Sequence, residues 1–259
     1  MTSISKNRQR AAVDRMTGSA LVAGAGGGIG RSLLQVLRAR RGIDLDPDAT
    51  DGPVMGSARR PGGMGLLDAD ITDENAVMHL AAQVAARMAD AGDLRLVIVA
   101  TGFLHGNGMS PEKALRDLDP AALAHAFAVN AIGPALLMKH LLPLLPRRGR
   151  AVFACLSARV GSIGDNGYGG WYGYRASKAA LNQLVRTGSI ELRRRNPEAL
   201  CVALHPGTVD TPLSAPFARS GLAVQTPEAA AARLLDVIDG LEPRQSGGFF
   251  DHRGAAVPW

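Results

Sequence analysis

The sequence alternates short apolar runs with longer stretches of helical periodicity, and this alternation constrains the fold more than any other feature. Strands of a parallel sheet are buried on both faces, so they are almost continuously apolar, and each is joined to the next by a crossover that is usually a helix. The pattern therefore predicts a doubly wound α/β domain with a mainly parallel sheet flanked by helices. We expect seven strands, at residues 20–23, 54–57, 65–67, 96–100, 151–156, 200–204 and 248–250, and five helices, at 28–41, 73–91, 120–145, 172–195 and 227–240.

Length and composition agree with one such domain. The 259 residues are 46% hydrophobic and 20% charged, which is enough to bury a large core. No internal repeat or low-complexity linker divides the sequence, so we expect a single domain over residues 19–259. Residues 1–18 carry four basic side chains against one acidic one and show no sustained period, and we interpret them as a flexible basic arm.

The charge balance bears on partners rather than on fold. Lys and Arg number 29 against 23 Asp and Glu, a formal net charge of +6. The basic runs at 147–150 and 193–195 end predicted helices, where cations complement the helix dipole, and aromatic residues make up only 4%. No apolar run reaches the roughly 18 residues that cross a bilayer, and the N-terminus lacks the apolar middle of a secretion signal. We expect a cytoplasmic protein that binds neither nucleic acid nor membrane.

Cysteine and histidine give no sign of a metal or disulfide framework. Cys155 and Cys201 each lie inside an apolar run, which favours buried free thiols over a bridge. The six histidines show no paired ligand spacing, so no metal site is expected.

A glycine-rich segment, residues 23–30, lies where the first predicted strand turns into the first predicted helix. Glycine lets the backbone turn tightly and lets a pyrophosphate approach the helix N-terminus, whose free N–H groups favour an anion. Alone, a glycine run is also typical of a flexible turn. Its position between strand and helix favours the phosphate-binding turn of a Rossmann domain.

Four further positions offer chemistry. Tyr174 and Lys178 lie four residues apart in a predicted helix, so a cation could stabilise the phenolate on one helix face, although a surface Tyr–Lys pair has the same spacing. Ser157 follows the fifth predicted strand, at the edge where open α/β sheets bind ligands; it could also be an ordinary capping residue. Asn130 is a polar residue in an otherwise apolar helical stretch, and a buried amide there needs partners such as a backbone carbonyl and a water.

Jointly, these segments resemble the short-chain dehydrogenase/reductase family, from about residue 19 to the C-terminus. The resemblance includes residues 70–73 after the third predicted strand and 206–211 after the sixth. Segments 102–105, 170–178, 205–214 and 246–259 resemble the C-factor (C-signal) branch of that family. Two motifs depart from the family's pattern: Ala23 replaces the Thr that usually opens the glycine segment, and residues 99–102 replace the usual Asn-Asn-Ala-Gly.

The resemblance implies a role for each residue. Tyr174 would be the general acid/base, Ser157 would orient the substrate oxygen, Lys178 would bind the nicotinamide ribose and lower the tyrosine pKa, and Asn130 would anchor a proton-relay water. The implied cofactor contacts are Gly24, Gly28, Ile29, Gly30, Arg59, Asp70, Ile71, Gly102, Tyr174, Lys178, Pro206, Gly207, Val209 and Thr211. The resemblance also implies a substrate lid at about 211–225 and a homodimer or homotetramer built on helices 120–145 and 172–195.

The cofactor form depends on the residues at the end of the second strand. If that strand is 54–57, Ser57 and Arg59 offer a hydroxyl and a guanidinium to a 2′-phosphate, which favours NADP(H) over NAD(H). If it instead covers 43–45, Asp46 takes the position of a ribose-binding carboxylate and favours NAD(H). The sequence thus predicts an NADP(H)-dependent oxidoreductase acting on a carbonyl or alcohol. A C-factor-like signalling protein that binds the cofactor with little turnover is the alternative.

Overall fold

The computed structural model describes residues 18–40, 53–59, 66–217 and 224–259. The structure does not describe the predicted basic arm up to residue 17, the alternative strand 43–45 with Asp46, or the central part of the expected lid.

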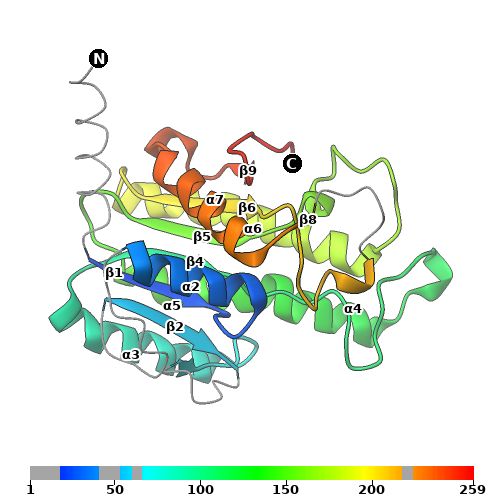
Figure 1. Ribbon diagram of the computed structural model, residues 1–259, viewed down its shortest axis with the longest axis horizontal. Helices are drawn as coiled ribbons and strands as arrows, with labels where there is room; N and C mark the ends of the chain where they lie inside the picture. Colours follow the sequence, from blue (N-terminus) through cyan, green and yellow to red (C-terminus); the bar gives the residue numbers. More distant parts are fainter. Residues whose placement is uncertain (1–17, 41–52, 60–65, 218–223) are drawn as a thin grey trace.

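Seven strands of the described chain form one sheet whose neighbours all pair in parallel (Figure 1). Their order, β3-β2-β1-β4-β5-β6-β9, reverses between β1 and β4. The strands are β1 (Ser19–Ala23), β2 (Val54–Ala58), β3 (Leu67–Asp68), β4 (Leu94–Val99), β5 (Val152–Leu156), β6 (Leu200–His205) and β9 (Phe249–Asp251). The predicted parallel sheet is confirmed, because fully apolar runs such as those of β1 and β5 are buried along their whole length.

Helices cover both faces of the sheet (Figure 1). They are α2 (Gly28–Arg40), α3 (Glu74–Ala91), α4 (Pro120–Phe127), α5 (Gly133–Leu141), α6 (Tyr172–Arg195) and α7 (Pro227–Gly240), with 3-10 turns at Leu115–Asp117, Leu142–Leu144, Arg159–Gly161, Ala215–Phe217 and Pro243–Gln245. One core contains Leu80 of α3, Leu137 of α5 and Leu181 of α6. The other contains Leu37 of α2 and Leu234 of α7. Alternate residues of the central strands enter the two cores, as a doubly wound sheet requires.

The predicted helix 120–145 is not continuous. A π-helical turn, Ala128–Ile132, separates α4 from α5 and contains the buried Asn130. Pro134 explains the widened turn, because it has no N–H to donate and its ring would clash with the carbonyl four residues earlier, that of Asn130. The break therefore lies at the residue that the sequence singled out as an unusual buried amide.

By length and composition, the 25-residue stretch Pro120–Leu144 could cross a membrane, because an 18-residue window in it has a mean hydropathy of 1.6. The stretch is still not the unbroken apolar run of about 18 residues that the sequence was found to lack, since His125, Asn130 and Lys139 interrupt it. The stretch packs Leu137, Met138 and Leu141 into the core of the domain. A core helix passes the same test, so the property decides nothing about membranes.

Two short strands were not predicted. β7 (Thr208–Val209) pairs in parallel with β8 (Val224–Gln225), outside the main sheet. Each contains only two residues, too few for a periodicity to be visible. The pairing brings the last residues of the segment expected to form the lid next to residues 208–209, which precede that segment.

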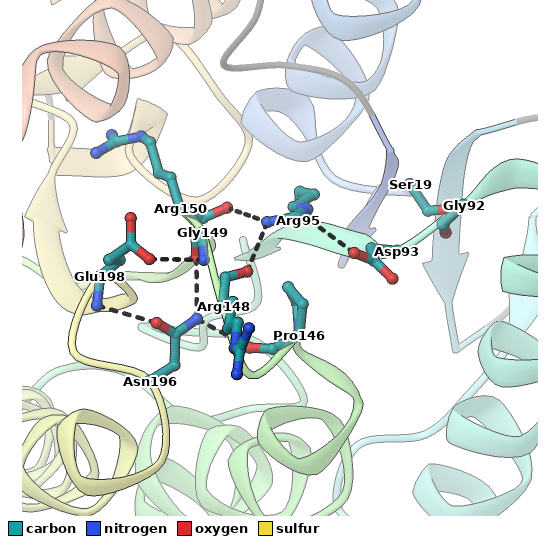
Figure 2. Close-up of polar contacts among 10 residues, drawn as sticks. All are labelled: Ser19, Gly92, Asp93, Arg95, Pro146, Arg148, Gly149, Arg150, Asn196 and Glu198. Atoms are coloured by element: carbon teal, nitrogen blue, oxygen red, sulfur yellow. Dashed lines mark hydrogen bonds and ion pairs between the residues drawn. The ribbon is translucent and has the colours of Figure 1, made fainter.

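A polar network joins the amino ends of β1, β4, β5 and β6 (Figure 2). Asn196 is fully buried and its Nδ2 donates to the carbonyls of Pro146 and Gly149, both at 2.9 Å. Arg95 donates to the carbonyls of Arg148 and Arg150 at 3.1 and 3.2 Å. These contacts fix the sheet at the edge opposite the candidate site.

Candidate functional site

A cavity of about 390 Å³ lies at the carboxyl ends of β1 and β4, where the strand order reverses. In open α/β sheets this is the place where ligands bind. The cavity is lined by the glycine turn, the ends of β2 and β3, the loop after β4, and α4 with its π turn. The residues are Gly24, Gly26, Gly27, Ala58, Arg59, Ala69, Asp70, Ile71, Thr72, Ala100, Thr101, Gly102, Phe103, Asn107, His125 and Val129. The structure thus brings the predicted residues Gly24, Arg59, Asp70, Ile71 and Gly102 to one cavity.

Three glycines of the turn, Gly24, Gly28 and Gly30, have no room for side chains. Gly24 has a φ of +87°, and a Cβ there would lie 2.9 Å from Cγ2 of Thr101. A side chain at Gly30 would collide with the carbonyl of Gly24, and one at Gly28 would lie 2.9 Å from Cγ2 of Thr211. The backbone is therefore exposed to the cavity where α2 begins. The predicted residue Ile29 lies on the same turn and packs against the second core.

Two observations show that the cavity suits a nucleotide. The hydroxyl oxygen of Thr101 is buried and has no hydrogen-bond partner in the described chain, so a bound polar group could satisfy it. At the other wall, burial alone would raise the pKa of Asp70, but hydrogen bonds from the Thr72 N–H and hydroxyl, helped by the charges of Arg59 and His125, hold it below its ordinary value. An ionised Asp70 carboxylate can accept hydrogen bonds from the amino or hydroxyl groups of a nucleotide. The residues present fit a dinucleotide.

Lys178 is the buried cation of the site. It is 3% exposed, and its Nζ donates to the carbonyl of Leu156 at 2.8 Å. A Cβ at Gly102 would lie 3.8 Å from this Nζ and 3.7 Å from Oδ1 of Asn130. Burial lowers the pKa of Lys178 to about 8, opposed by the neighbouring thiol of Cys155. The ammonium group therefore lies beside a glycine that lines the cavity.

Asn130 forms hydrogen bonds with the backbone of the loop that follows β4. It is fully buried; its Oδ1 accepts from the N–H of Phe103 and its Nδ2 donates to the carbonyl of Phe103, both at 2.8 Å. The Nδ2 also donates to Oγ of Ser177 at 3.0 Å. A backbone carbonyl is thus one partner of Asn130, as the sequence suggested. The bond from the N–H of Phe103 also fixes the position of Gly102, which directly precedes Phe103.

Ser157 follows β5 and is buried. Its hydroxyl donates to Oδ1 of Asn182 at 2.6 Å, and Nδ2 of Asn182 donates to the carbonyl of Gly161 at 3.2 Å. Sequence reasoning missed Asn182. A signal was present, because Tyr174, Lys178 and Asn182 follow one another at intervals of four and so share a helix face.

Tyr174 lies in the first turn of α6 and is half-buried. Burial raises the pKa of its phenol to about 12. Lowering it toward neutrality therefore requires positive charge next to the phenol beyond what the chain itself supplies. The ring of Tyr174 lies edge to face with that of Trp171, with centroids 6.2 Å apart.

The predicted contacts at 206–211 lie on the loop after β6. Gly207 has a φ of +81°, and Gln225 of β8 donates to the carbonyl of Pro206 at 3.2 Å. Val209 belongs to β7, and the hydroxyl of Ser214 donates to the carbonyl of Val209. Together with the approach of Thr211 to Gly28, these bonds place the loop across the entrance of the glycine turn.

His105 lies in the loop after β4 and is partly buried. Its Nε2 donates to the carbonyls of Pro212 and Leu213, both at 3.1 Å. Its ring packs edge to face on Phe217, whose ring also contacts Trp171. The imidazole is therefore engaged by the described part of the expected lid.

Both cysteines are buried free thiols, as predicted. Among the residues that the structure describes, no cluster of three or more His, Cys, Asp and Glu side chains could hold a metal ion.

The fold and site define a dinucleotide-binding α/β protein of the dehydrogenase type, and comparison with known families agrees. The family model for short chain dehydrogenase matches residues 19–220. The chain belongs to the short-chain dehydrogenase/reductase family.

Relatives within the family differ in what their names describe. The chain is 43% identical to C-signal of Myxococcus xanthus over 147 residues, which are 56% of this chain and 84% of that protein. It is 32% identical to 1-hydroxy-2-glutathionyl-2-methyl-3-butene dehydrogenase of Rhodococcus sp. (strain AD45), over 92% of this chain and 98% of that one. Among solved structures, NADPH-bound carbonyl reductase from chicken fatty liver aligns with a TM-score of 0.78 at 27% identity, covering 93% of this chain and 98% of the other.

Proposed function

We propose that the protein is an NADP(H)-dependent oxidoreductase that interconverts a carbonyl and an alcohol, with Tyr174 as the general acid/base. The observation that carries the proposal is the convergence of Lys178 and Asn130 on Gly102, at the wall of the glycine-lined cavity. A buried ammonium and a buried amide at this point suit a ribose and a nicotinamide, whereas a protein that only presented a surface would not need either.

In this proposal the nicotinamide supplies or accepts the hydride when it is bound. The Tyr174 hydroxyl donates or accepts the proton at the substrate oxygen. Ser157 orients that oxygen, and the Ser157 hydroxyl is itself positioned by its hydrogen bond to Oδ1 of Asn182. The Lys178 ammonium binds ribose hydroxyls and favours the phenolate, while Asn130 fixes Gly102 and anchors a relay water.

We propose NADP(H) over NAD(H) because Arg59 lines the cavity at the end of β2. Its guanidinium can bind a 2′-phosphate, and a charge-assisted hydrogen bond of this kind contributes about 1.5–3 kcal/mol. That corresponds to about a tenfold to hundredfold preference. The chicken carbonyl reductase, which is NADPH-bound, supports the choice. Titration with NADPH and NADH tests it, and Arg59→Ala should remove most of the difference. An NADH preference in the unaltered protein would refute the NADP(H) assignment.

The catalytic proposal is tested by Tyr174→Phe. This change should lower turnover of a carbonyl substrate by about 10²–10⁴-fold, the usual contribution of a general acid. Binding of NADPH and the melting temperature should stay near those of the unaltered protein. Tyr168→Phe is the matched control, because Tyr168 is 97% exposed. Turnover that survives in the Tyr174 variant would exclude its assignment as acid/base.

The similarity to C-signal favours a second candidate, a signalling protein that binds nicotinamide cofactor with little turnover. The 43% identity over 147 residues is the observation behind it. A screen of carbonyl compounds under NADPH distinguishes the two. Binding without consumption across aliphatic and aromatic ketones and aldehydes would favour the signalling role.

We also propose a cytoplasmic homodimer or homotetramer, with a basic arm at 1–18, one domain over 19–259 and a substrate lid at about 211–225. Two large apolar side chains on the helices expected to pair are exposed: Ile132 is 52% and Ile190 is 48% exposed. Contact between copies would cover them. Light scattering that gives a 27.0 kDa particle would contradict the assembly.

A further inference from the structure

A buried carboxylate from another part of the chain contacts the beginning of α6. Glu112 lies in the loop after β4 and is only 8% exposed. Its Oε2 accepts from the N–H of Gly173 at 3.1 Å, and its main-chain carbonyl accepts from the N–H of Trp171 at 2.5 Å. One residue thus contacts the backbone on both sides of Tyr172, the first residue of the helix.

Helix α6 lacks a cap of its own. The residue before it, Trp171, makes no side-chain capping bond and has left-handed backbone angles, φ 53° and ψ 44°. The first amides of a helix have no partner within the helix, and negative charge there is favoured by the dipole. The carboxylate of Glu112 meets both needs. Gly173 leaves room for it, because a Cβ at that position would lie 2.8 Å from Oε1 of Glu112.

This contact lies next to the proposed acid/base. Tyr174 directly follows Gly173, and the ring of Trp171 touches both Tyr174 and Phe217, with centroids 6.2 and 5.2 Å apart. Without the Glu112 carboxylate, the amide of Gly173 loses its acceptor, whereas the main-chain carbonyl of Glu112 still accepts from the N–H of Trp171. The first turn of α6, and with it the phenol, would then be free to move.

We propose that Glu112 is a positioning residue for Tyr174, acting through the bond of its carboxylate to the backbone N–H of Gly173. Its effect on catalysis rests on the proposed function, whereas its effect on the first turn of α6 and on the neighbouring Trp171 does not. Displacement of a catalytic group by about 1 Å can lower a rate by about 10²-fold. The proposal therefore predicts a loss in kcat with little change in the KM for NADPH, because the glycine turn lies elsewhere.

The kinetic test compares three variants with the unaltered protein. Glu112→Ala removes the carboxylate that accepts from Gly173 while keeping the main-chain bond to Trp171, and it should lower kcat between tenfold and about a hundredfold. Glu112→Gln keeps an acceptor oxygen and should restore most of that loss. Asp119→Ala is the matched control, because Asp119 is a carboxylate of the same loop that caps α4 by accepting from the N–H of Ala122 at 2.7 Å. It should leave kcat unchanged.

A second measurement does not depend on turnover. In a Trp259→Phe background, Trp171 is the remaining tryptophan of the chain. Glu112→Ala should move its fluorescence emission to longer wavelength as the indole gains contact with water, whereas Glu112→Gln and Asp119→Ala should not.

The outcomes separate the two proposals. If the emission wavelength of Trp171 does not change in Glu112→Ala, the Glu112 carboxylate does not determine the conformation at the start of α6, and the proposal is overturned. Moved emission with a kcat like that of Asp119→Ala overturns the positioning of Tyr174. If no carbonyl substrate is turned over by the unaltered protein, the proposed function fails, and the emission alone decides whether Glu112 sets the start of α6.

Discussion

Replacing Asn130 by alanine tests whether one buried amide holds the wall of the cavity. The side chain makes three hydrogen bonds, two to Phe103 and one to Ser177. Each lost bond costs about 1 kcal/mol where the orphaned group can still reach water, and more where it cannot. The Phe103 groups are partly buried, so we expect a loss of about 3 kcal/mol. For a chain of this size that lowers the melting temperature by about 6 °C.

Calorimetry of Asn130→Ala measures this loss, and Ser177→Ala provides a graded control. Ser177 gives up only its bond from Asn130 and its own bond to the carbonyl of Tyr174, while both Phe103 bonds remain. It should cost about 1–2 kcal/mol. Because Gly102 adjoins Phe103, we also expect weaker NADPH binding in Asn130→Ala than in Ser177→Ala. Equal melting temperatures for Asn130→Ala and the unaltered protein would refute the reasoning.

Three further predictions concern both edges of the sheet. Asn196→Ala should lower the free energy of unfolding by about 3 kcal/mol without changing turnover, because it removes the three hydrogen bonds of a buried amide far from the cavity. Arg148 is exposed, so Arg148→Ala should change neither stability nor turnover, and differential scanning calorimetry distinguishes the two variants. Burial lowers the pKa of His205 from 6.5 to about 4, so the unfolded chain binds a proton at a higher pH than the folded chain does. The free energy of unfolding should therefore fall by up to about 3 kcal/mol as the pH drops from 6.5 to 4. Urea titrations should show a smaller fall in His205→Asn. Asn182→Ala should lower kcat more than it raises the KM for substrate, because it releases the hydroxyl of Ser157; an unchanged kcat in steady-state assays would count against that link.

Periodicity located the main elements because it reports burial directly. The predicted ranges of α6 and α7 match the structure residue for residue, and α3 differs only in that Asp73 is its cap, accepting from the N–H of Asn75. The elements that were not predicted have no periodic signal. The two-residue strands β7 and β8 depend on contacts between distant parts of the chain. The π turn before Pro134 depends on a single backbone clash.

The candidate site divides in the same way. The motifs predict Ser157, Tyr174 and Lys178 as site residues because their residue types and spacing are local in the sequence. Their partners could not be found so directly: Asn182 bonds Ser157 across 25 positions and Glu112 bonds Gly173 across 61. Whether a hydroxyl or an amide is held by a distant side chain depends on packing, and a single sequence does not record which surfaces meet.

Buried polar side chains lie at both the amino and the carboxyl edge of the sheet, and their chemistry differs. At the amino edge, Asn196 and its neighbours bond backbone groups to one another, so their effect is on the free energy of unfolding. At the carboxyl edge, Asn130 and Glu112 bond backbone next to groups that would touch cofactor or substrate. Substitutions at the amino edge should therefore lower stability at constant turnover, whereas those at the carboxyl edge should lower both, because there the same hydrogen bonds that stabilise the fold also set the position of the reacting groups.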